Sequence, residues 1–161
     1  MIIKSFVRSI ALPAILTVAV LLPPSALALE LSLPALQVVS GQSFDIPVTI
    51  DKVENLAGVK LVLVYNNRLI TFKKGARTPH TTAMMHMIND TKPGRLVIVM
   101  ATARGIKGHN MTIMTLTFEA KKGLKQSTTE EMKIPEIQLM SDTLKNLDCR
   151  VQINPLVILP E

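Results

Sequence analysis

Several kinds of residue are scarce in this chain of 161 residues. It has one cysteine, no tryptophan, one tyrosine and four phenylalanines. A single cysteine excludes an internal disulfide, so a stable fold requires a hydrophobic core. The shortage of aromatic rings disfavours nucleic-acid binding and many forms of sugar binding, because both stack their ligands on aromatic side chains. With 7 Gly and 10 Pro, the composition is neither collagen-like nor of low complexity.

The charge of the chain is only mildly basic, with 18 Lys and Arg against 12 Asp and Glu. The densest basic runs are Lys73-Lys74 and residues 121–125. A nucleic-acid site would concentrate these side chains on one face, whereas here they are dispersed. We therefore expect no nucleic-acid partner.

Residues 1–28 have the three parts of a secretory signal peptide: a basic start, an apolar stretch from Ile10 to Leu22, and a small-x-small exit that ends at Ala28. The apolar stretch is shorter than the roughly 20 residues that span a bilayer. We expect cleavage after Ala28, with an uncleaved anchor as the alternative. The sequence thus predicts a signal peptide (1–28) and one domain (29–161), which meets the membrane only during export and then resides in the periplasm or outside the cell.

From Leu31 onward, apolar and polar residues alternate with a period of two, which is typical of β-strands. The alternation predicts that the even-numbered residues of 44–50 and 114–120 face inward. Pro47 interrupts the first of these strands, which we therefore expect at a sheet edge or beside a bulge. The predicted strands are 36–39, 44–50, 59–65, 69–72, 83–88, 96–102, 113–120, 134–139 and 151–159. Predicted turns lie at 40–42, 55–58, 66–67, 92–94, 105–110 and 121–123.

Nine short strands without a long helix predict an all-β fold, a single antiparallel β-sandwich. The stretches 127–132 and 141–147 are too short for a stable isolated helix and are assigned to loops.

Catalytic chemistry has little support in the sequence. His80, His86 and His109 are scattered, and no motif brings one of them to a serine or to Cys149. His80 and His86 could approach each other across a loop, but their spacing does not resemble a zinc site. A calcium loop is absent as well. We expect no enzyme activity, no cofactor and no bound metal.

The methionines allow two interpretations. Met84, Met85 and Met87 crowd one short segment. Flexible thioethers fill irregular gaps in cores, and they also form adaptable binding surfaces. The sequence alone leaves both interpretations open.

Two predicted strands are apolar on both faces, which is unusual in a two-layer sandwich, because the outer face of each strand meets water. If Val59, Leu61 and Leu63 face the core, then Lys60, Val62 and Val64 face outward; on the second strand the outward set is Arg95, Val97, Val99 and Ala101. If both strands lie in one sheet, these seven residues form an apolar patch with a basic rim. Such a patch is typical of a protein-docking surface. The alternative is that a loop or a terminal segment covers it.

Four segments resemble cohesin domains: Val39–Ile50, Val53–Asn66, Pro93–Val99 and Thr115–Ala120. The resemblance runs from about Leu31 to Ile158. It implies a nine-stranded jelly-roll sandwich that binds a dockerin, a small helical module carrying its own calcium. It places the dockerin on a sheet face that includes Lys60–Asn66 and Arg95–Ala101. The chain departs from the family where Tyr65-Asn66-Asn67 replaces Tyr-Asp-Pro, which puts the hydrogen bonds of that turn in doubt.

From these observations we expect an exported, non-catalytic protein-binding module whose partner is dockerin-like. One alternative is a polysaccharide-binding module of the related carbohydrate-binding fold, which would need a planar row of exposed aromatic rings. Another is a structural subunit of an envelope assembly that pairs through its strand edges.

Overall fold

The computed structural model describes residues 28–161, so the predicted signal peptide lies outside the described residues except for Ala28. In this part of the chain the fold is all-β, as predicted, and no helix has the length and apolar character needed to cross a membrane. The elements in chain order are β1 (Leu29–Leu33), β2 (Leu36–Val39), β3 (Ser43–Val64), β4 (Ile70–Arg77), the short 3-10 helix η1 (Pro79–Thr81), β5 (Met85–Lys92), β6 (Arg95–Ala120), β7 (Thr128–Glu130), β8 (Lys133–Met140), β9 (Asn146–Leu147), β10 (Cys149–Ile153) and β11 (Leu156–Leu159).

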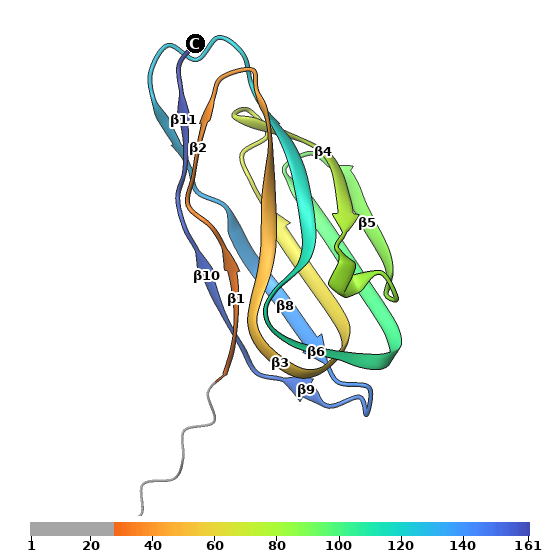
Figure 1. Cartoon of the computed structure of the whole chain (residues 1–161). Coiled ribbons are helices and arrows are strands. Elements are labelled where there is room, and N and C mark those ends of the chain that lie inside the picture. Colours follow the sequence, from red (N-terminus) through yellow and green to blue (C-terminus); the bar gives the residue numbers. More distant parts are fainter. Residues whose placement is uncertain (1–27) are drawn as a thin grey trace, which may run out of the picture.

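The long antiparallel pair of β3 and β6 forms the centre of the sandwich. The two strands stay paired from Ser43↔Glu119 to Val64↔Arg95 and bend back together at the lower end of the molecule (Figure 1). The bend coincides with register shifts between Val53 and Gly58, where the sequence predicted a turn. The predicted turn at 105–110 is likewise part of β6. Each long strand therefore contains two of the predicted strands, because bulges let a paired ribbon turn a corner without breaking its ladder.

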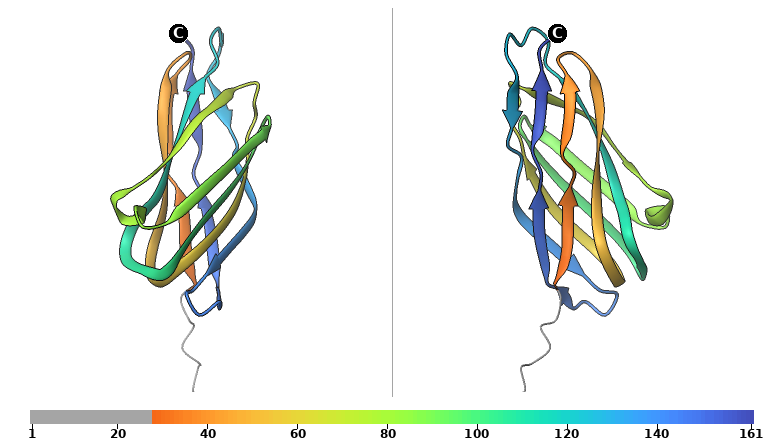
Figure 2. Two further views of the ribbon diagram at one scale, coloured as in Figure 1. Left: turned by 90° about the vertical axis from the view of Figure 1, so that its right-hand side faces the viewer. Right: turned by 60° about the vertical axis from the view of Figure 1, so that its left-hand side comes forward.

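Two layers result from this bend. One has the strand order β10-β1-β3-β6-β4, and the other is formed by β8, β3, β6 and β5. A smaller sheet has the order β2-β11-β7. Two pairings, β1 with β10 and β2 with β11, are parallel, and Figure 2 shows these blue and orange strands side by side. The predicted loops at 127–132 and 141–147 contain β7 and β9.

One hydrophobic core lies between the two layers, and it receives the inward residues of both halves of the bent pair. The predicted inward sets are buried, apart from Phe44, which is half-buried. Pro47 lies beside a register shift and beyond the end of the β1 pairing, as its sequence position predicted. The core residues of the two halves are Ile46, Val48, Ile50, Val59, Leu61, Leu63, Leu96, Ile98, Met100, Met114, Leu116 and Phe118.

The aromatic side chains of residues 28–161 lie in this core or pack against it. Phe118 lies at their centre, with ring centroids 5.1 Å from Tyr65, 5.5 Å from Phe72 and 6.1 Å from Phe44. Packing of the four rings against one another uses their hydrophobic area inside the fold. These four rings therefore do not form the exposed planar row that polysaccharide binding would require.

Candidate partner-binding face

The outward face of the β8-β3-β6-β5 layer contains all seven predicted site residues. Val62 of β3 lies opposite Val97 of β6, and Lys60 lies opposite Val99. The same register places Val64 beside Arg95, and Ala101 beside Gly58. The two doubly apolar strands are thus neighbours in one sheet, which the sequence analysis had to assume.

The alternate residues of both strands belong to the core, so the seven site residues point away from it. Val64, Val97 and Val99 are half-buried, and Lys60, Arg95 and Ala101 are exposed. Among the elements of residues 28–161, none forms a further layer over this face. Six of the seven predicted site residues keep exposed surface in the described chain, whereas Val62 is buried.

Val62 differs from the other valines because it is only 2% exposed, although it does not belong to the core cluster. It lies in the middle of the layer, with a paired strand on each side. Neighbouring side chains on the same face therefore enclose it, which alternation along a single strand cannot predict. These neighbours are Lys60, Val64, Val97 and Glu136.

Strand β5 extends the apolar face beyond the predicted residues. Met85 lies opposite Ala101 and Met87 opposite Val99, and they are 76% and 64% exposed. Met84 is fully buried in the core. The structure thus places Met84 in the core and leaves Met85 and Met87 at the surface. The period-two alternation of residues 85–88 could have predicted that Met85 and Met87 face outward, because Ile88 packs against the core and the two methionines alternate with it.

An ion pair lies at the β8 side of the face. Lys60 Nζ is 2.5 Å from Glu136 Oε1, and both side chains remain about half exposed. The hydrogen bond from Lys60, its positive charge and that of Arg95 hold the pKa of the Glu136 carboxyl below its usual value. Lys60 belongs to the predicted basic rim, but its charge is already balanced by Glu136. Arg95 is the predicted basic residue that has no ion pair among the described residues.

The other groups singled out in the sequence do not come together. His80, His86 and His109 are all exposed and lie on η1, β5 and the bend of β6. Within residues 28–161, no three His, Cys, Asp or Glu side chains are placed to hold a metal ion. Cys149 is half-buried, and burial raises the pKa of its thiol. None of these residues forms a catalytic arrangement in this part of the chain.

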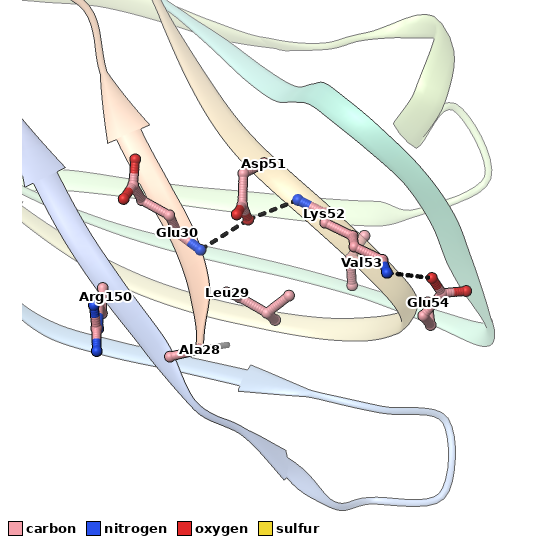
Figure 3. Close-up of a pocket in the computed structure, with 8 residues that line it drawn as sticks. All are labelled: Ala28, Leu29, Glu30, Asp51, Lys52, Val53, Glu54 and Arg150. Atoms are coloured by element: carbon pink, nitrogen blue, oxygen red, sulfur yellow. Dashed lines mark hydrogen bonds and ion pairs between the residues drawn. The ribbon is translucent and has the colours of Figure 1, made fainter. Parts of the chain in front are cut away.

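A pocket of about 480 Å³ opens near the start of β1, away from the apolar face (Figure 3). Two of its three carboxylates, those of Asp51 and Glu54, interact with neighbouring groups. Asp51 Oδ1 accepts hydrogen bonds from the backbone N–H groups of Glu30 at 2.8 Å and Lys52 at 2.6 Å, while Lys52 Nζ lies 3.5 Å from Glu54. No histidine, serine or cysteine of residues 28–161 lines this pocket. The groups present therefore offer no nucleophile paired with a base.

The turn at Tyr65-Asn66-Asn67 has an asparagine where the family that the sequence resembles usually has an aspartate, and hydrogen bonds stabilise this turn. Asn66 Oδ1 accepts a hydrogen bond from the Arg68 N–H at 3.0 Å, and the Asn66 N–H donates to Glu130 Oε1 at 2.8 Å. Asparagine forms this local turn as well as aspartate does. Glu130 is buried, and this burial raises the pKa of its carboxyl despite the hydrogen bond.

Comparison with known families identifies the fold. The family model for the cohesin domain matches residues 29–154. The chain belongs to the cohesin family. Cohesin domains are non-enzymatic binding modules, in agreement with the expectation that this chain is not an enzyme. A comparison with curated protein sequences gives no significant match.

Solved cohesin structures have the same fold at low sequence identity. A type I cohesin–dockerin complex from Clostridium thermocellum matches with a TM-score of 0.74 at 15% identity, covering 83% of this chain and 95% of that one. The sixth cohesin of scaffoldin B from Acetivibrio cellulolyticus, also in complex with a dockerin, matches with a TM-score of 0.71 at 15% identity, covering 83% and 99%. A non-cellulosomal cohesin from Archaeoglobus fulgidus matches with a TM-score of 0.66 at 13% identity, covering 83% and 91%.

Proposed function

We propose that this cohesin domain is an exported, non-catalytic module that captures a dockerin-like protein through the outward face of β8, β3, β6 and β5. The observation that carries the proposal is the apolar row on β6 and β5, which no element of the described chain covers. Solved cohesins of the same fold form complexes with dockerins, which gives the partner class. Cohesins are typically extracellular or at the cell surface, in keeping with export through residues 1–28.

The exposures on this face indicate which residues contribute to binding. Desolvation of apolar surface drives most protein association, so a residue contributes in proportion to the area that it still exposes. Met85 and Met87 expose most of their side chains, Val97 and Val99 expose part of theirs, and Val62 has almost nothing left to bury. The methionines and the β6 valines are therefore the proposed apolar contacts, with Val64 and Ala101 beside them and Val62 as support beneath.

Charge supplies orientation at the edge of this face. Arg95 is exposed and has no ion pair among the described residues. Lys92, at the end of β5, lies opposite Arg95. Basic groups at the rim of an interface accelerate association with an acidic partner and fix its register. We therefore propose a partner whose contact surface is apolar in the middle and acidic towards Arg95.

The test is titration calorimetry of the purified protein against a panel of calcium-loaded dockerin modules. Met87→Asp places a charge within the proposed contact, and Ala76→Asp places the same charge at an exposed position on β4, an edge strand of the other layer. We expect Met87→Asp to abolish binding, Ala76→Asp to leave it unchanged, and both variants to unfold at nearly the wild-type temperature. Equal loss of binding in both variants would exclude this face.

Calcium removal provides a second control. In the proposal the metal belongs to the partner, so a chelator should abolish binding without changing the unfolding temperature of the cohesin alone. The alternatives have their own assays: retardation in polysaccharide gels would support glycan binding, and self-association in sedimentation experiments would support an envelope subunit. Either result without dockerin binding would refute the proposal.

A further inference from the structure

The eight methionines of the described chain differ widely in accessibility. Met85 and Met87 are largely exposed, Met140 is half-buried, and the other five are buried. The two exposed sulfur side chains lie two residues apart on one strand, so they project from the same face of the layer. The buried five are Met84, Met100, Met111, Met114 and Met132.

We propose that Met85 and Met87 form a peroxide-sensitive modification site that weakens partner binding when the two thioethers are oxidised. The effect on binding rests on the proposed function; the selectivity of the oxidation rests on accessibility alone. The oxidant is a hydroperoxide, and the product is methionine sulfoxide, which dedicated reductases convert back to methionine.

The reaction needs no residue of the protein as a catalyst. A lone pair on sulfur attacks one peroxide oxygen, so that an S–O bond forms as the O–O bond breaks. The sulfur loses two electrons, the peroxide gains them, and the transferred hydroxyl gives its proton to the departing oxygen, which leaves as water when hydrogen peroxide is the oxidant. Access of the peroxide to sulfur therefore decides which methionines react, and Met85 and Met87 lie open to solvent.

The position of the two methionines explains why oxidation would matter. Their cross-strand neighbours are Ala101 and Val99, so both thioethers adjoin the apolar row of β6. A sulfoxide oxygen is strongly polar, and removing it from water against an apolar partner is unfavourable unless a new hydrogen bond compensates. Oxidation should leave the stability of the isolated domain unchanged, because neither side chain is packed in the core. Oxidation of these two methionines would therefore weaken partner binding without affecting folding.

The experiment treats the purified protein with graded hydrogen peroxide and follows each methionine by peptide mass spectrometry. We expect Met85 and Met87 to oxidise at least about tenfold faster than the five buried methionines, with no change in the unfolding temperature, since reactivity follows exposure. Oxidation that falls first on a buried methionine, or that unfolds the domain as Met85 and Met87 react, would overturn the proposal.

The binding measurement uses a calcium-loaded dockerin module and compares the Kd after and before peroxide within each protein. In the wild type we expect this ratio to rise about tenfold or more. In the variant M85L/M87L, which keeps apolar side chains of similar volume but has no sulfur at these positions, the ratio should stay close to one. A wild-type ratio near one after complete oxidation would refute the inference and leave the docking proposal intact. Absence of binding before peroxide treatment would refute the docking proposal and, with it, the proposed effect of oxidation on binding.

Discussion

Truncation to alanine should affect stability at Val62 and partner binding at Met85 and Met87, although all three residues lie on the same face. Val62 is enclosed by its neighbours, whereas Met85 and Met87 are open to solvent. We expect Val62→Ala to lower the stability of the domain with little effect on dockerin binding. The double variant M85A/M87A should weaken binding and leave stability unchanged.

The magnitudes follow from the area that each side chain buries. Val62→Ala removes two buried methyl groups at about 0.8 kcal/mol each, so the free energy of unfolding should fall by about 1–2 kcal/mol. Full burial of a methionine is worth about 1.5–3 kcal/mol. Met85 and Met87, at 76% and 64% exposure, therefore offer about 1–2 kcal/mol each. Ordering two flexible side chains offsets about half of this gain, which leaves about 1–2 kcal/mol in total, or about 5- to 30-fold in Kd.

Urea denaturation and calorimetric titration of the same preparations measure both quantities. Leu144→Ala is a matched control for exposed apolar area, since Leu144 is 78% exposed but lies in the loop between β8 and β9. It should change neither binding nor stability by more than about 0.5 kcal/mol. The reasoning is wrong if Val62→Ala weakens binding as much as M85A/M87A does, because the bound area would then lie over the β3 side of the sheet.

Three other perturbations have definite directions. Glu136→Gln removes the partner of Lys60 and should speed association with an acidic dockerin surface at low salt, an effect that stopped-flow measurements should find abolished at about 1 M salt. Because burial raises the pKa of Glu130, the folded state holds the proton of this carboxyl more tightly than the unfolded state does, and stability is lost as pH rises through this pKa. In urea titrations at a series of pH values, Glu130→Gln should therefore be more stable than the wild type at neutral pH and equal to it near pH 3 or below. Leu144→Gly relieves a non-glycine residue at φ 60° and should raise stability by about 0.5–1 kcal/mol in thermal unfolding, whereas a lower unfolding temperature would show that the exposed leucine makes a stabilising contact.

Local alternation was sufficient to predict which residues of the long strands face inward. The even-numbered residues of 44–50 and 114–120 and the odd-numbered residues of 59–65 point into the core because a strand allows only two side-chain directions. The turn at Lys92-Pro93-Gly94 was predictable for a similar local reason. Gly94 has φ +82°, and a Cβ there would lie 2.9 Å from the Tyr65 carbonyl oxygen.

Features that depend on distant partners were not predictable in this way. Strand β1 pairs with β10 about 120 residues later in the chain, and β7 pairs with β11. The bend near Asn55 kept its strand pairing although its sequence resembled a turn. There the Asn55 side chain donates to Asp142 at 2.6 Å, while the Asp142 N–H donates back at 3.3 Å. Contacts between β3 and the β8–β9 loop hold this corner, and no local pattern contains them.

The sequence by itself determined which side chains face inward along residues 44–50, 59–65 and 114–120, since alternation is a property of one strand. Only the tertiary structure decided how much of each outward side chain meets water. Val62 has a strand on both sides and is enclosed, whereas Met85 and Met87 lie on an edge strand that has a neighbour on one side only. Burial depends on neighbours across the sheet, so residues with the same alternation differ in their capacity to bind a partner.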